Sequence, residues 1–384
     1  MTSICKEELT NILNEGKIIR VSKEVSIATL WAGYGSVSSF KAVTKDSNRS
    51  IALIVKRVNP SNSVNDQSVS HQRKIRSYFV EAYFYKQLVP RMLLQWKKVK
   101  SDTSLPPTVP TPYSIEHSDK TSDSPSFTFL ISDLRTNYRG SQSMYLTKSE
   151  TESALNFLAK FHASFWEEDF DENLWVCGGY WHLDTRKDEY ENISRNEWGS
   201  LKAIAYAIDR RMKNNGSSRH RVICHGDFKE ANLLFKRHND GSCDCAAVDY
   251  QYSGHGYGMK DVVMLIVSSV SPSVASNSGE RELLQYYYKA LTKSVKDVGK
   301  NISGLTLNEL IVQYELCLVD YVRFMAGWGM WGSNCNYAAE RVCFILNELE
   351  EIASQRWSTS KLGKLSESDL DTLINIRFPV LIES

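Results

Sequence analysis

His225-Gly226-Asp227-Phe228-Lys229-Glu230-Ala231-Asn232, followed by Asp249-Tyr250-Gln251, is the stretch of sequence that says most about the fold of this chain. Asp227 can take a proton from a hydroxyl group. Asn232, five positions later, offers Mg²⁺ an uncharged oxygen ligand, and Asp249 offers an anionic one. Phosphoryl transfer asks little covalent chemistry of a protein and depends on positioning and on charge neutralisation. These side chains are therefore the set that phosphoryl transfer needs.

Short apolar runs flank these residues and predict three strands. Residues 221–224 enter the loop, residues 233–235 leave it, and residues 246–248 end at Asp249. Ligands at the ends of neighbouring strands can reach one metal ion. Asp and Asn are also ordinary turn residues, and for Asp227 by itself that explanation is equally good. The flanking strands, together with Asp249, favour a functional site.

The motif resembles the catalytic loop and metal-binding acid of kinases, in a His-Gly-Asp form rather than the His-Arg-Asp form of protein kinases. His-Gly-Asp with an asparagine five residues after the aspartate is similar to the aminoglycoside phosphotransferase and choline kinase superfamily. The Asp249-Tyr250-Gln251 ending resembles its ecdysteroid-kinase-like (CHK-kinase-like) branch. The resemblance implies a two-lobed, protein-kinase-like α+β fold. It also implies that ATP and Mg²⁺ are used to phosphorylate a hydroxyl group of a small molecule.

Length and charge agree with such a protein. A chain of 384 residues exceeds one typical core and suits two lobes. Its hydrophobic content of 42% and charged content of 24% are ordinary for a globular protein. The formal net charge of +1 gives no argument for a nucleic acid or an anionic membrane surface as partner. We expect a small-molecule hydroxyl substrate as the partner, and the sequence leaves the oligomeric state open.

The N-terminus and the cysteines favour a cytoplasmic location. Residues 1–9 hold three charged side chains and no apolar run, so no secretory signal is expected. The apolar run 262–267 is far too short to span a bilayer. Eight cysteines in a chain of this length are expected to be reduced thiols. Cys243 and Cys245 lack the spacing of a zinc site and are expected in a polar turn.

The part of the chain before the catalytic loop predicts a small antiparallel sheet with one main helix. The expected elements, in order, are a short helix around 9–13, strands at 25–31, 38–43 and 51–56, a helix at 74–88 stopped by Pro90, and strands at 113–116 and 127–131. This is the order of a kinase amino-terminal lobe, with Ser132 to Leu134 as the hinge. We expect residues 1–131 to form the nucleotide-binding lobe and residues 132–384 the catalytic and acceptor-binding lobe.

Beyond the hinge the pattern becomes mostly helical. Residues 147–150 and 306–309 both have the spacing of a helix capping box. Each is followed by apolar residues at helical spacing, which predicts a helix with one buried face. The carboxy-terminal lobe is therefore expected to be built largely of helices.

Lys56 is the candidate for the phosphate-binding lysine. It ends an apolar strand, where a charge is costly unless it has a partner. Glu81, on the next expected helix, could be that partner, as in the lysine–glutamate pair of kinases. The alternative is that both residues are ordinary charges facing water.

Gly33, Gly35 and Ser36 lie between two expected strands and could bring backbone amides close to phosphate. Glycine lets the chain approach a ligand and adopt positive φ. Two glycines also make a plain hairpin turn, and the third glycine of the protein-kinase loop is missing. The resemblance further implies that adenine bonds to backbone groups between Ser132 and Leu134.

Three residues near the motif are expected to be mainly structural. His225 would shape the loop, although a histidine there could also act on a proton. Asp261 would open the next helix, either bracing the catalytic loop or capping the helix. His162 lies on an apolar helix face and is expected to be a satisfied core histidine.

The acceptor pocket is expected among the carboxy-terminal helices. Trp328 and Trp331 lie in a glycine-rich stretch, two turns and more after Asp320. Aromatic faces with an acid suit a cationic acceptor, aromatic faces alone suit an apolar ring system, and the cluster could equally be core. A second unusual stretch, residues 175–186, either lines the cleft or packs against it.

Two other functions compete with a small-molecule kinase. A protein kinase needs a long activation segment, but only 11 residues separate Asp249 from Asp261. A nucleotide-binding scaffold without turnover is the other alternative. The intact set of Asp227, Asn232 and Asp249 argues against it.

Overall fold

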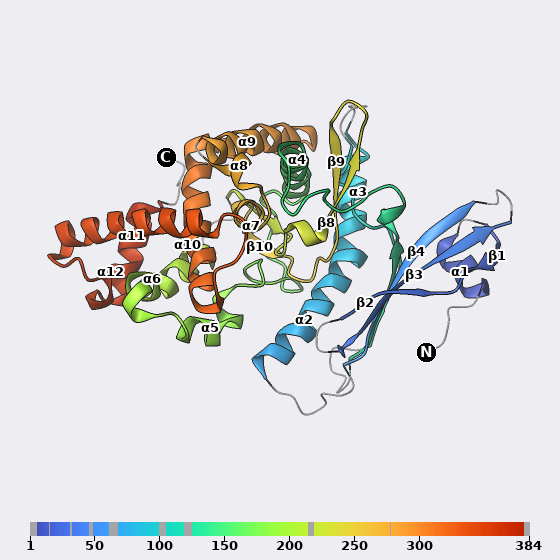
Figure 1. The fold of residues 1–384 in the computed structure, drawn as a ribbon, viewed down its shortest axis with the longest axis horizontal. Helices are drawn as coiled ribbons and strands as arrows, with labels where there is room; N and C mark the ends of the chain where they lie inside the picture. Colours follow the sequence, from blue (N-terminus) through green and yellow to red (C-terminus); the bar gives the residue numbers. More distant parts are fainter. Residues whose placement is uncertain are drawn as a thin grey trace.

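An antiparallel sheet comes first in this chain and a group of helices follows it, as the computed structural model shows (Figure 1). The structure describes residues 6–14, 16–30, 33–45, 49–60, 68–99, 105–118, 125–213, 219–276 and 278–379. The sheet occupies one end of the molecule and the helices fill the rest. The expected α+β fold, with an antiparallel sheet in the amino-terminal lobe and a mostly helical carboxy-terminal lobe, is confirmed.

The amino-terminal sheet is antiparallel throughout. Its strands are β1 (Ile18–Val21), β2 (Val25–Thr29), β3 (Gly35–Thr44), β4 (Ser50–Val58), β5 (Pro112–His117) and β6 (Phe127–Ser132). Their order is β1-β3-β4-β6-β5, and β2 pairs with β3. Strand β1 was not expected, and Trp31 and Ala32, expected next to the glycines, lie outside the described residues.

Strand β4 shows why this sheet forms. Alternate residues of a strand point to opposite faces. Ile51, Leu53 and Val55 are buried in a small core that also contains Leu9 and Leu13 of helix α1 (Lys6–Leu13). The alternation leaves position 56 on the other face of the sheet, toward the rest of the molecule.

The helix after β4 is longer than the sequence predicted. Helix α2 (Val69–Tyr83) runs through a π turn, η3 (Phe84–Leu88), into helix α3 (Val89–Trp96). The expectation that Pro90 stops the helix is wrong, because Pro90 lies in the first turn of α3. In the π turn the N–H of Val89 bonds to the carbonyl of Phe84, five residues back. This register change lets the helix continue past a residue that lacks an N–H.

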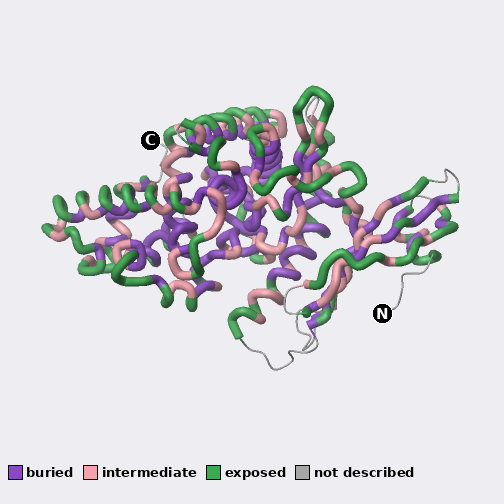
Figure 2. Tube along the Cα trace, viewed as in Figure 1, coloured by how far each residue is buried: buried purple, intermediate pink, exposed green. Residues whose placement is uncertain are grey.

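The carboxy-terminal lobe consists mainly of helices. They are α4 (Lys148–Ser164), α5 (Lys187–Glu191), α6 (Arg195–Lys213), α7 (Met259–Ser268), α8 (Pro272–Ala275), α9 (Gly279–Asp297), α10 (Leu307–Trp328), α11 (Cys335–Trp357) and α12 (Glu367–Arg377). Both expected capping boxes are present, at the starts of α4 and α10. Every residue of α7 is buried, and Figure 2 shows it at the centre of the lobe.

Two small antiparallel ribbons carry the catalytic motif. Strand β7 (Arg221–Cys224) pairs with β10 (Gly254–Tyr257), and β8 (Leu233–Arg237) pairs with β9 (Cys243–Ala247). The expectation that Cys243 and Cys245 lie in a turn is wrong, because both are on β9 and the turn is made before them. The seven cysteines among the described residues are free thiols.

Helix α2 packs with the carboxy-terminal lobe as well as with the sheet. The larger hydrophobic core joins residues of α2, η3 and α3 to α4, α7 and α10. The ring of Phe84 stacks on that of Tyr250 with centroids 3.8 Å apart. The Asp-Tyr-Gln motif is thus anchored under the π turn. In the described part of the chain, no helix has the length and apolar character needed to cross a membrane.

Candidate active site

The loop from β7 to β8 turns at Gly226. The φ of Gly226 is +83°, and a Cβ at this position would lie 2.0 Å from the carbonyl oxygen of Tyr252. Glycine is therefore required here both by the backbone conformation and by the lack of space. A 3₁₀ turn, η6 (Glu230–Asn232), then returns the chain to the start of β8.

Asp227 and Asn232 meet directly. The Nδ2 atom of Asn232 donates to the Oδ2 of Asp227 at 3.0 Å and to its carbonyl oxygen at 2.8 Å. Lys229 Nζ lies 3.0 Å from Oδ1 of Asp227. Burial raises the pKa of the Asp227 carboxyl above its ordinary value, Lys229 opposes this shift, and the charge of Asp249 adds to it. A buried carboxylate with a raised pKa is the kind of group that can act as a general base.

Asp261, at the start of α7, fixes the catalytic loop through hydrogen bonds to its backbone. Its Oδ2 accepts the backbone N–H of His225 at 2.7 Å, and its Oδ1 accepts that of Gly226 at 2.9 Å. His162 of α4 adds a bond to Oδ2 at 3.0 Å, and its other ring nitrogen bonds to Tyr287. Burial would raise the pKa of Asp261, but the bonds from His162 and Gly226 outweigh it and lower the pKa. Asp261 therefore remains an anion that fixes the loop.

His225 links the loop to the end of β9. Its Nε2 lies 3.1 Å from the carbonyl oxygen of Val248, and its Nδ1 accepts the N–H of Asp227 at 3.3 Å. Burial lowers the pKa of His225, which favours the neutral ring. A neutral imidazole with its proton on Nε2 satisfies both bonds, so His225 has a structural use for each ring nitrogen.

Asp249 and Asn232 are two adjacent oxygen donors suited to a hard cation. The N–H of Val248 donates to the carbonyl of Asn232 at 3.0 Å, which ties the two positions together. Oδ1 of Asp249 is a buried oxygen with no hydrogen-bond donor among the described residues. Because Asn232 uses Nδ2 toward Asp227, its amide oxygen remains for a ligand. Mg²⁺ is typically held by one or two carboxylates together with substrate phosphates, so these residues fit it.

The described residues contain no cluster of three or more His, Cys, Asp or Glu side chains that could hold a metal by themselves. A cation held by Asp249 and Asn232 would take its other ligands from phosphate oxygens or water, as Mg²⁺ commonly does.

Lys56 and Glu81 form a buried ion pair. Lys56 Nζ lies 2.7 Å from Oε2 of Glu81 and 3.9 Å from Oδ1 of Asp249. Burial would lower the pKa of Lys56, but Glu81 and Asp249 outweigh it, so the pKa lies above its ordinary value and the amine is a cation. Gln251 donates to Glu81 at 3.4 Å. The structure therefore brings β4, α2 and the Asp-Tyr-Gln motif to one point.

The glycine-rich turn lies between β2 and β3. A Cβ at Gly35 would lie 1.9 Å from the carbonyl oxygen of Arg57, so β4 runs too close for any side chain there. Gly33 has a φ of +70° and open space where its Cβ would be. Ser36 pairs with Arg57 in the sheet. Tyr34, between the glycines, bonds through its hydroxyl to His71 of α2 at 2.6 Å. The turn is thereby anchored to the helix that carries Glu81.

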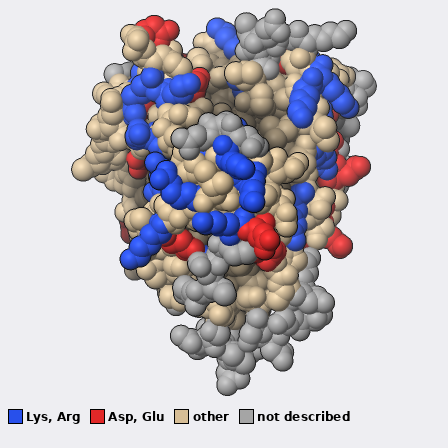
Figure 3. All heavy atoms as spheres, turned by 90° about the vertical axis from the view of Figure 1, so that its right-hand side faces the viewer, with Lys and Arg blue, Asp and Glu red and all other residues tan. Residues whose placement is uncertain are grey.

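A cavity of about 620 Å³ lies between the sheet and the carboxy-terminal lobe, next to the hinge. Its lining comes from both sides and includes Val25, Phe40, Ala52, Asp133, Thr136 and Leu234. Four basic residues also line it: Lys23, Lys41, Arg135 and Arg139. Figure 3 shows that Lys and Arg side chains gather on this end of the molecule. The lining mixes charged, polar and apolar side chains, and among the residues expected to bind the nucleotide only the hinge contributes to it, through Asp133.

The hinge places Ser132 at the end of β6 and Leu134 at the start of the 3₁₀ turn η4 (Leu134–Thr136). The N–H of Ser132 donates to Thr111 at 2.9 Å, and that of Asp133 donates to Ala52 at 3.0 Å. Both donors are used by the protein itself. A base bound in the cavity would have to bond to other backbone groups of the hinge.

Comparison with known proteins agrees with this geometry. Residues 182–300, which include the catalytic loop, match the model of the "Ecdysteroid kinase-like family". The similarity covers this segment and not the whole chain. The resemblance expected from the motif is thereby confirmed. A search of curated proteins gives no match.

Several solved structures resemble the chain at a distance. Choline kinase from Cryptosporidium parvum is 11% identical, with 87% of this chain and 90% of that one covered and a TM-score of 0.47. Amicoumacin kinase is 10% identical, with 90% and 91% covered and a TM-score of 0.40. An aminoglycoside phosphotransferase from Streptomyces rimosus is 13% identical, with 80% and 93% covered and a TM-score of 0.39. The fold class rests on the strand and helix topology described above and not on these distant likenesses.

The second unusual stretch of the sequence borders the catalytic loop. The N–H of Tyr180 donates to the carbonyl of Gly226 at 3.2 Å, and the N–H of Gly179 donates to that of Tyr252. Trp175 donates through Nε1 to the carbonyl of Gln251 at 2.9 Å. Residues 175–186 therefore pack against the catalytic loop. Sequence reasoning missed Tyr180 because nothing local relates it to Gly226.

Lys229 was also missed, although a signal was present. It lies two residues after Asp227, and the structure places its Nζ both on Asp227 and 5.6 Å from the centre of the Tyr180 ring. A lysine two residues after a candidate base lies close enough to pair with it, so the spacing alone could have predicted this ion pair. Its contacts connect the base to the segment 175–186.

The three residues expected in the acceptor pocket, Asp320, Trp328 and Trp331, lie in different environments. Asp320 is buried, and it pairs with Lys260 at 3.0 Å and with Arg323 at 2.9 Å. Burial would raise the pKa of Asp320, but these two cations outweigh it and hold the pKa well below its usual range. Trp328 is 59% exposed, whereas Trp331 packs against the hydrophobic core. Asp320 therefore has no free charge to offer a ligand.

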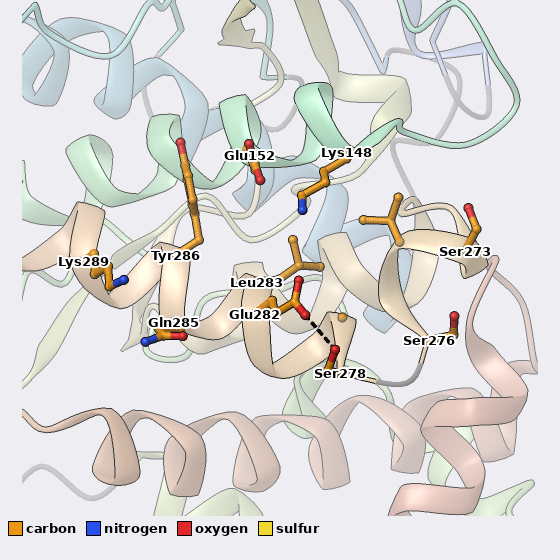
Figure 4. Close-up of a pocket in the computed structure, with 12 residues that line it drawn as sticks. Lys148, Glu152, Ser273, Ser276, Ser278, Glu282, Leu283, Gln285, Tyr286 and Lys289 are labelled. Atoms are coloured by element: carbon orange, nitrogen blue, oxygen red, sulfur yellow. Dashed lines mark hydrogen bonds between the residues drawn. The ribbon is translucent and has the colours of Figure 1, made fainter.

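A second cavity, of about 440 Å³, lies between the start of α4 and helices α8 and α9 (Figure 4). Its lining includes two lysines and two glutamates, so its charges balance: Lys148, Lys289, Glu152 and Glu282. Ser278 donates to Glu282 at 2.6 Å. None of the residues expected in the active site lines this cavity.

Proposed function

We propose that this protein is an ATP- and Mg²⁺-dependent kinase that phosphorylates a hydroxyl group of a small molecule. The observation that carries the proposal is the convergence at Asp249. A buried lysine, paired with Glu81 of α2, reaches within 3.9 Å of this carboxylate. On the loop beside it, Asn232 bonds to the candidate base Asp227. A cation for phosphates, a metal donor set and a general base thus occupy one place.

Each residue then has a defined task. Asp227 takes the proton of the acceptor hydroxyl on its carboxylate as the hydroxyl oxygen attacks the terminal phosphorus of ATP and the bond from that phosphorus to ADP breaks. Lys56, held by Glu81, binds phosphate oxygens. Asn232 and Asp249 would hold Mg²⁺, which neutralises charge on the transferred group. Asn232 also orients Asp227 through its amide N–H. The task of the protein is to position and to neutralise charge, which supplies most of the catalysis in this reaction.

The remaining nucleotide contacts follow from the fold. Backbone amides around Gly33, Gly35 and Ser36 would lie over the phosphates, and backbone groups from Ser132 to Leu134 would bind the base in the cavity of about 620 Å³. Residues 1–131 then form a nucleotide lobe and residues 132–384 a catalytic and acceptor lobe.

The acceptor is proposed to be a small molecule rather than a protein. The chain passes from Asp249 through β10 directly into α7, which begins at Met259. All residues between are described, and Gly254–Tyr257 among them pair with β7, which leaves too few residues for a long peptide-docking segment. The family model that matches residues 182–300 is named for ecdysteroid kinases, and this name supports a small hydroxyl compound as a class.

A screen of a metabolite extract with Mg·ATP, in which mass spectrometry detects an added phosphate, tests the proposal. Asp227→Asn is the matched control. It should lose about 10²–10⁴-fold in rate, the usual contribution of a general base, and keep Mg·ATP binding close to wild type. A variant that retains more than a tenth of the rate would remove Asp227 as base. Mg·ATP binding with no transfer to any compound would favour a nucleotide-binding scaffold.

A further inference from the structure

One cation of the chain itself occupies an aromatic cage beside the catalytic loop. The guanidinium of Arg186 lies 5.4 Å from the ring centre of Tyr180, 5.3 Å from that of Phe324 and 5.5 Å from that of Trp328. Arg186 is only 7% exposed. Its Nε donates to the carbonyl of Tyr180 at 2.7 Å, and its Nη1 donates to Glu189 at 2.9 Å. Three aromatic faces and one carboxylate therefore surround this side chain.

The fold builds the cage from two distant segments. Helix α5 lies beside the end of α10 (Figure 1), and a Cβ at Gly327 would lie 1.8 Å from the carbonyl oxygen of Glu189. Glycine at 327 thus lets the two helices touch, which brings Trp328 to Arg186. This contact explains the first glycine of the stretch 327–332.

The cage adjoins the candidate base. Tyr180 bonds through its N–H to Gly226 of the catalytic loop, and its ring lies 5.6 Å from Lys229 Nζ. Lys229 in turn lies 3.0 Å from Asp227. Tyr180 and the side chains around it therefore form a wall beside Asp227.

The other features that would recognise a cation are also occupied by cations of the chain. Lys260 Nζ lies 3.0 Å from Asp320 and 4.8 Å from the ring centre of Trp181. Arg323 takes the second oxygen of Asp320. Asp320 and the ring of Trp181, which could have bound a positively charged acceptor, are thus already in contact with cations of the protein.

The charges of the side chains beside the catalytic loop also disfavour a positively charged acceptor. Arg186 and Lys229 match the two carboxylates, Glu189 and Asp227. Arg73 of α2 adds a further cation, bonded to the carbonyl of Thr185 at 2.8 Å. Burial and repulsion from Arg186 lower the pKa of Arg73. Among these described residues, three cations thus face two carboxylates.

We propose that the acceptor is an uncharged or anionic hydroxyl compound, and that Arg186 determines this specificity by filling the aromatic cage and excluding cations. The inference rests on the proposed function, since it takes the wall beside Asp227 as the acceptor site. Removal of the Arg186 side chain should open a cage of the kind that binds quaternary ammonium groups.

Choline and its neutral isostere 3,3-dimethylbutan-1-ol test this proposal, because they share a shape and differ in charge. Binding to the full chain, without nucleotide, is followed by tryptophan fluorescence and by ligand-observed NMR. The wild type should prefer the neutral compound by at least about tenfold in Kd. Arg186→Ala should shift this ratio toward choline by about tenfold or more. Arg186→Lys, which keeps the charge, should behave as wild type.

Arg356→Ala is a matched control, because Arg356 makes the same type of contact with Trp357, at 5.3 Å, on α11. It should leave the ratio unchanged. If Arg186→Ala does not fold, as judged by circular dichroism, Arg186→Ser replaces it and the wild-type ratio is decisive by itself. A wild type that binds choline as tightly as the neutral isostere overturns the proposal. A folded Arg186→Ala or Arg186→Ser variant whose ratio of the two Kd values equals that of the wild type also overturns it. Failure of the kinase function would instead appear as absent Mg·ATP binding, which this assay does not use.

Discussion

The carboxylate of Asp261 accepts the backbone N–H of His225 across 2.7 Å, so the first residue of the catalytic motif is held by a residue 36 positions later. The same carboxylate accepts the N–H of Gly226 and a bond from His162. Asp261 is fully buried, and each oxygen has at least one donor. The position of Asp227 is thus set by an anion that does not itself face the substrate.

Asp261→Asn should destabilise the protein as well as slow it. The variant loses the charge that three donors share, and its amide places N–H groups opposite N–H groups. Breaking a buried charged network typically costs about 3 kcal/mol or more. Urea unfolding at neutral pH measures this loss. Asp371→Asn, which breaks an exposed pair with Arg210, is the control and should cost no more than about 1 kcal/mol. Equal effects of the two substitutions would show that Asp261 does not brace the loop.

Lys229 should set the pH at which the enzyme becomes active. The base must be ionised, so the rate falls as the pH drops through the pKa of Asp227. Burial raises this pKa, and the nearby Lys229 cation opposes that rise. Removal of the cation in Lys229→Met should therefore move the acidic limb of the kcat/KM profile to higher pH. Lys229→Arg keeps the charge and should keep the limb nearer to its wild-type position. If the acidic limb lies at the same pH in the wild type, Lys229→Met and Lys229→Arg, then Lys229 does not influence the pKa of Asp227.

The sequence predicted the parts of the site that depend on local pattern. The strands around Asp227 and Asp249 are visible as apolar runs, and both helix caps are visible as Thr-x-x-Glu spacing. The α+β order follows from the same patterns. These features need only neighbours in the chain, so composition and spacing suffice to find them.

Features that depend on distant contacts could not be predicted. The π turn before Pro90 begins at Phe84, whose ring stacks on that of Tyr250, more than 160 residues away in the chain. The cation in the aromatic cage requires α5 to meet α10 at Gly327. Asp320 was expected near the acceptor as a free acid, but its partner Lys260 lies 60 residues earlier. Pairings of this kind are set by packing and leave no periodic trace in the sequence.

Asp249 should contribute more to Mg²⁺ affinity than Asn232. Asp249→Ala should weaken Mg²⁺-dependent nucleotide binding more than Asn232→Ala, because a carboxylate brings charge to the metal and an amide does not. Asn232→Ala should additionally slow transfer, since it removes a hydrogen bond to Asp227. Titration of Mg²⁺ at fixed ATP compares the variants. Asp244→Ala, an exposed acid on β9 that pairs with His238, is the control. Equal Mg²⁺ affinity in the Asp249 and Asn232 variants would contradict the ranking, and unchanged affinity in both would place the metal elsewhere.

Lys56 and Glu81 should act as a unit. Lys56→Met deletes the cation nearest Asp249 while keeping an apolar stem in the sheet, so ATP binding should weaken and transfer should slow by roughly tenfold or more. Glu81→Gln leaves the lysine charge and removes its orienting partner, so its defect should be milder. The double variant should lose little more than Lys56→Met, as expected for groups that work together.

A double-mutant cycle on kcat measures the coupling between these two residues. The neighbouring pair Arg57 and Glu24, whose atoms lie 2.7 Å apart, is a control from the same strand. Arg57→Met and Glu24→Gln remove a similar ion pair that does not contact Asp249, so the rate should change far less. Strictly additive losses at Lys56 and Glu81 would show that they do not form a functional pair. In that case helix α2 would serve to pack the two lobes together and would have no direct part in holding the phosphates.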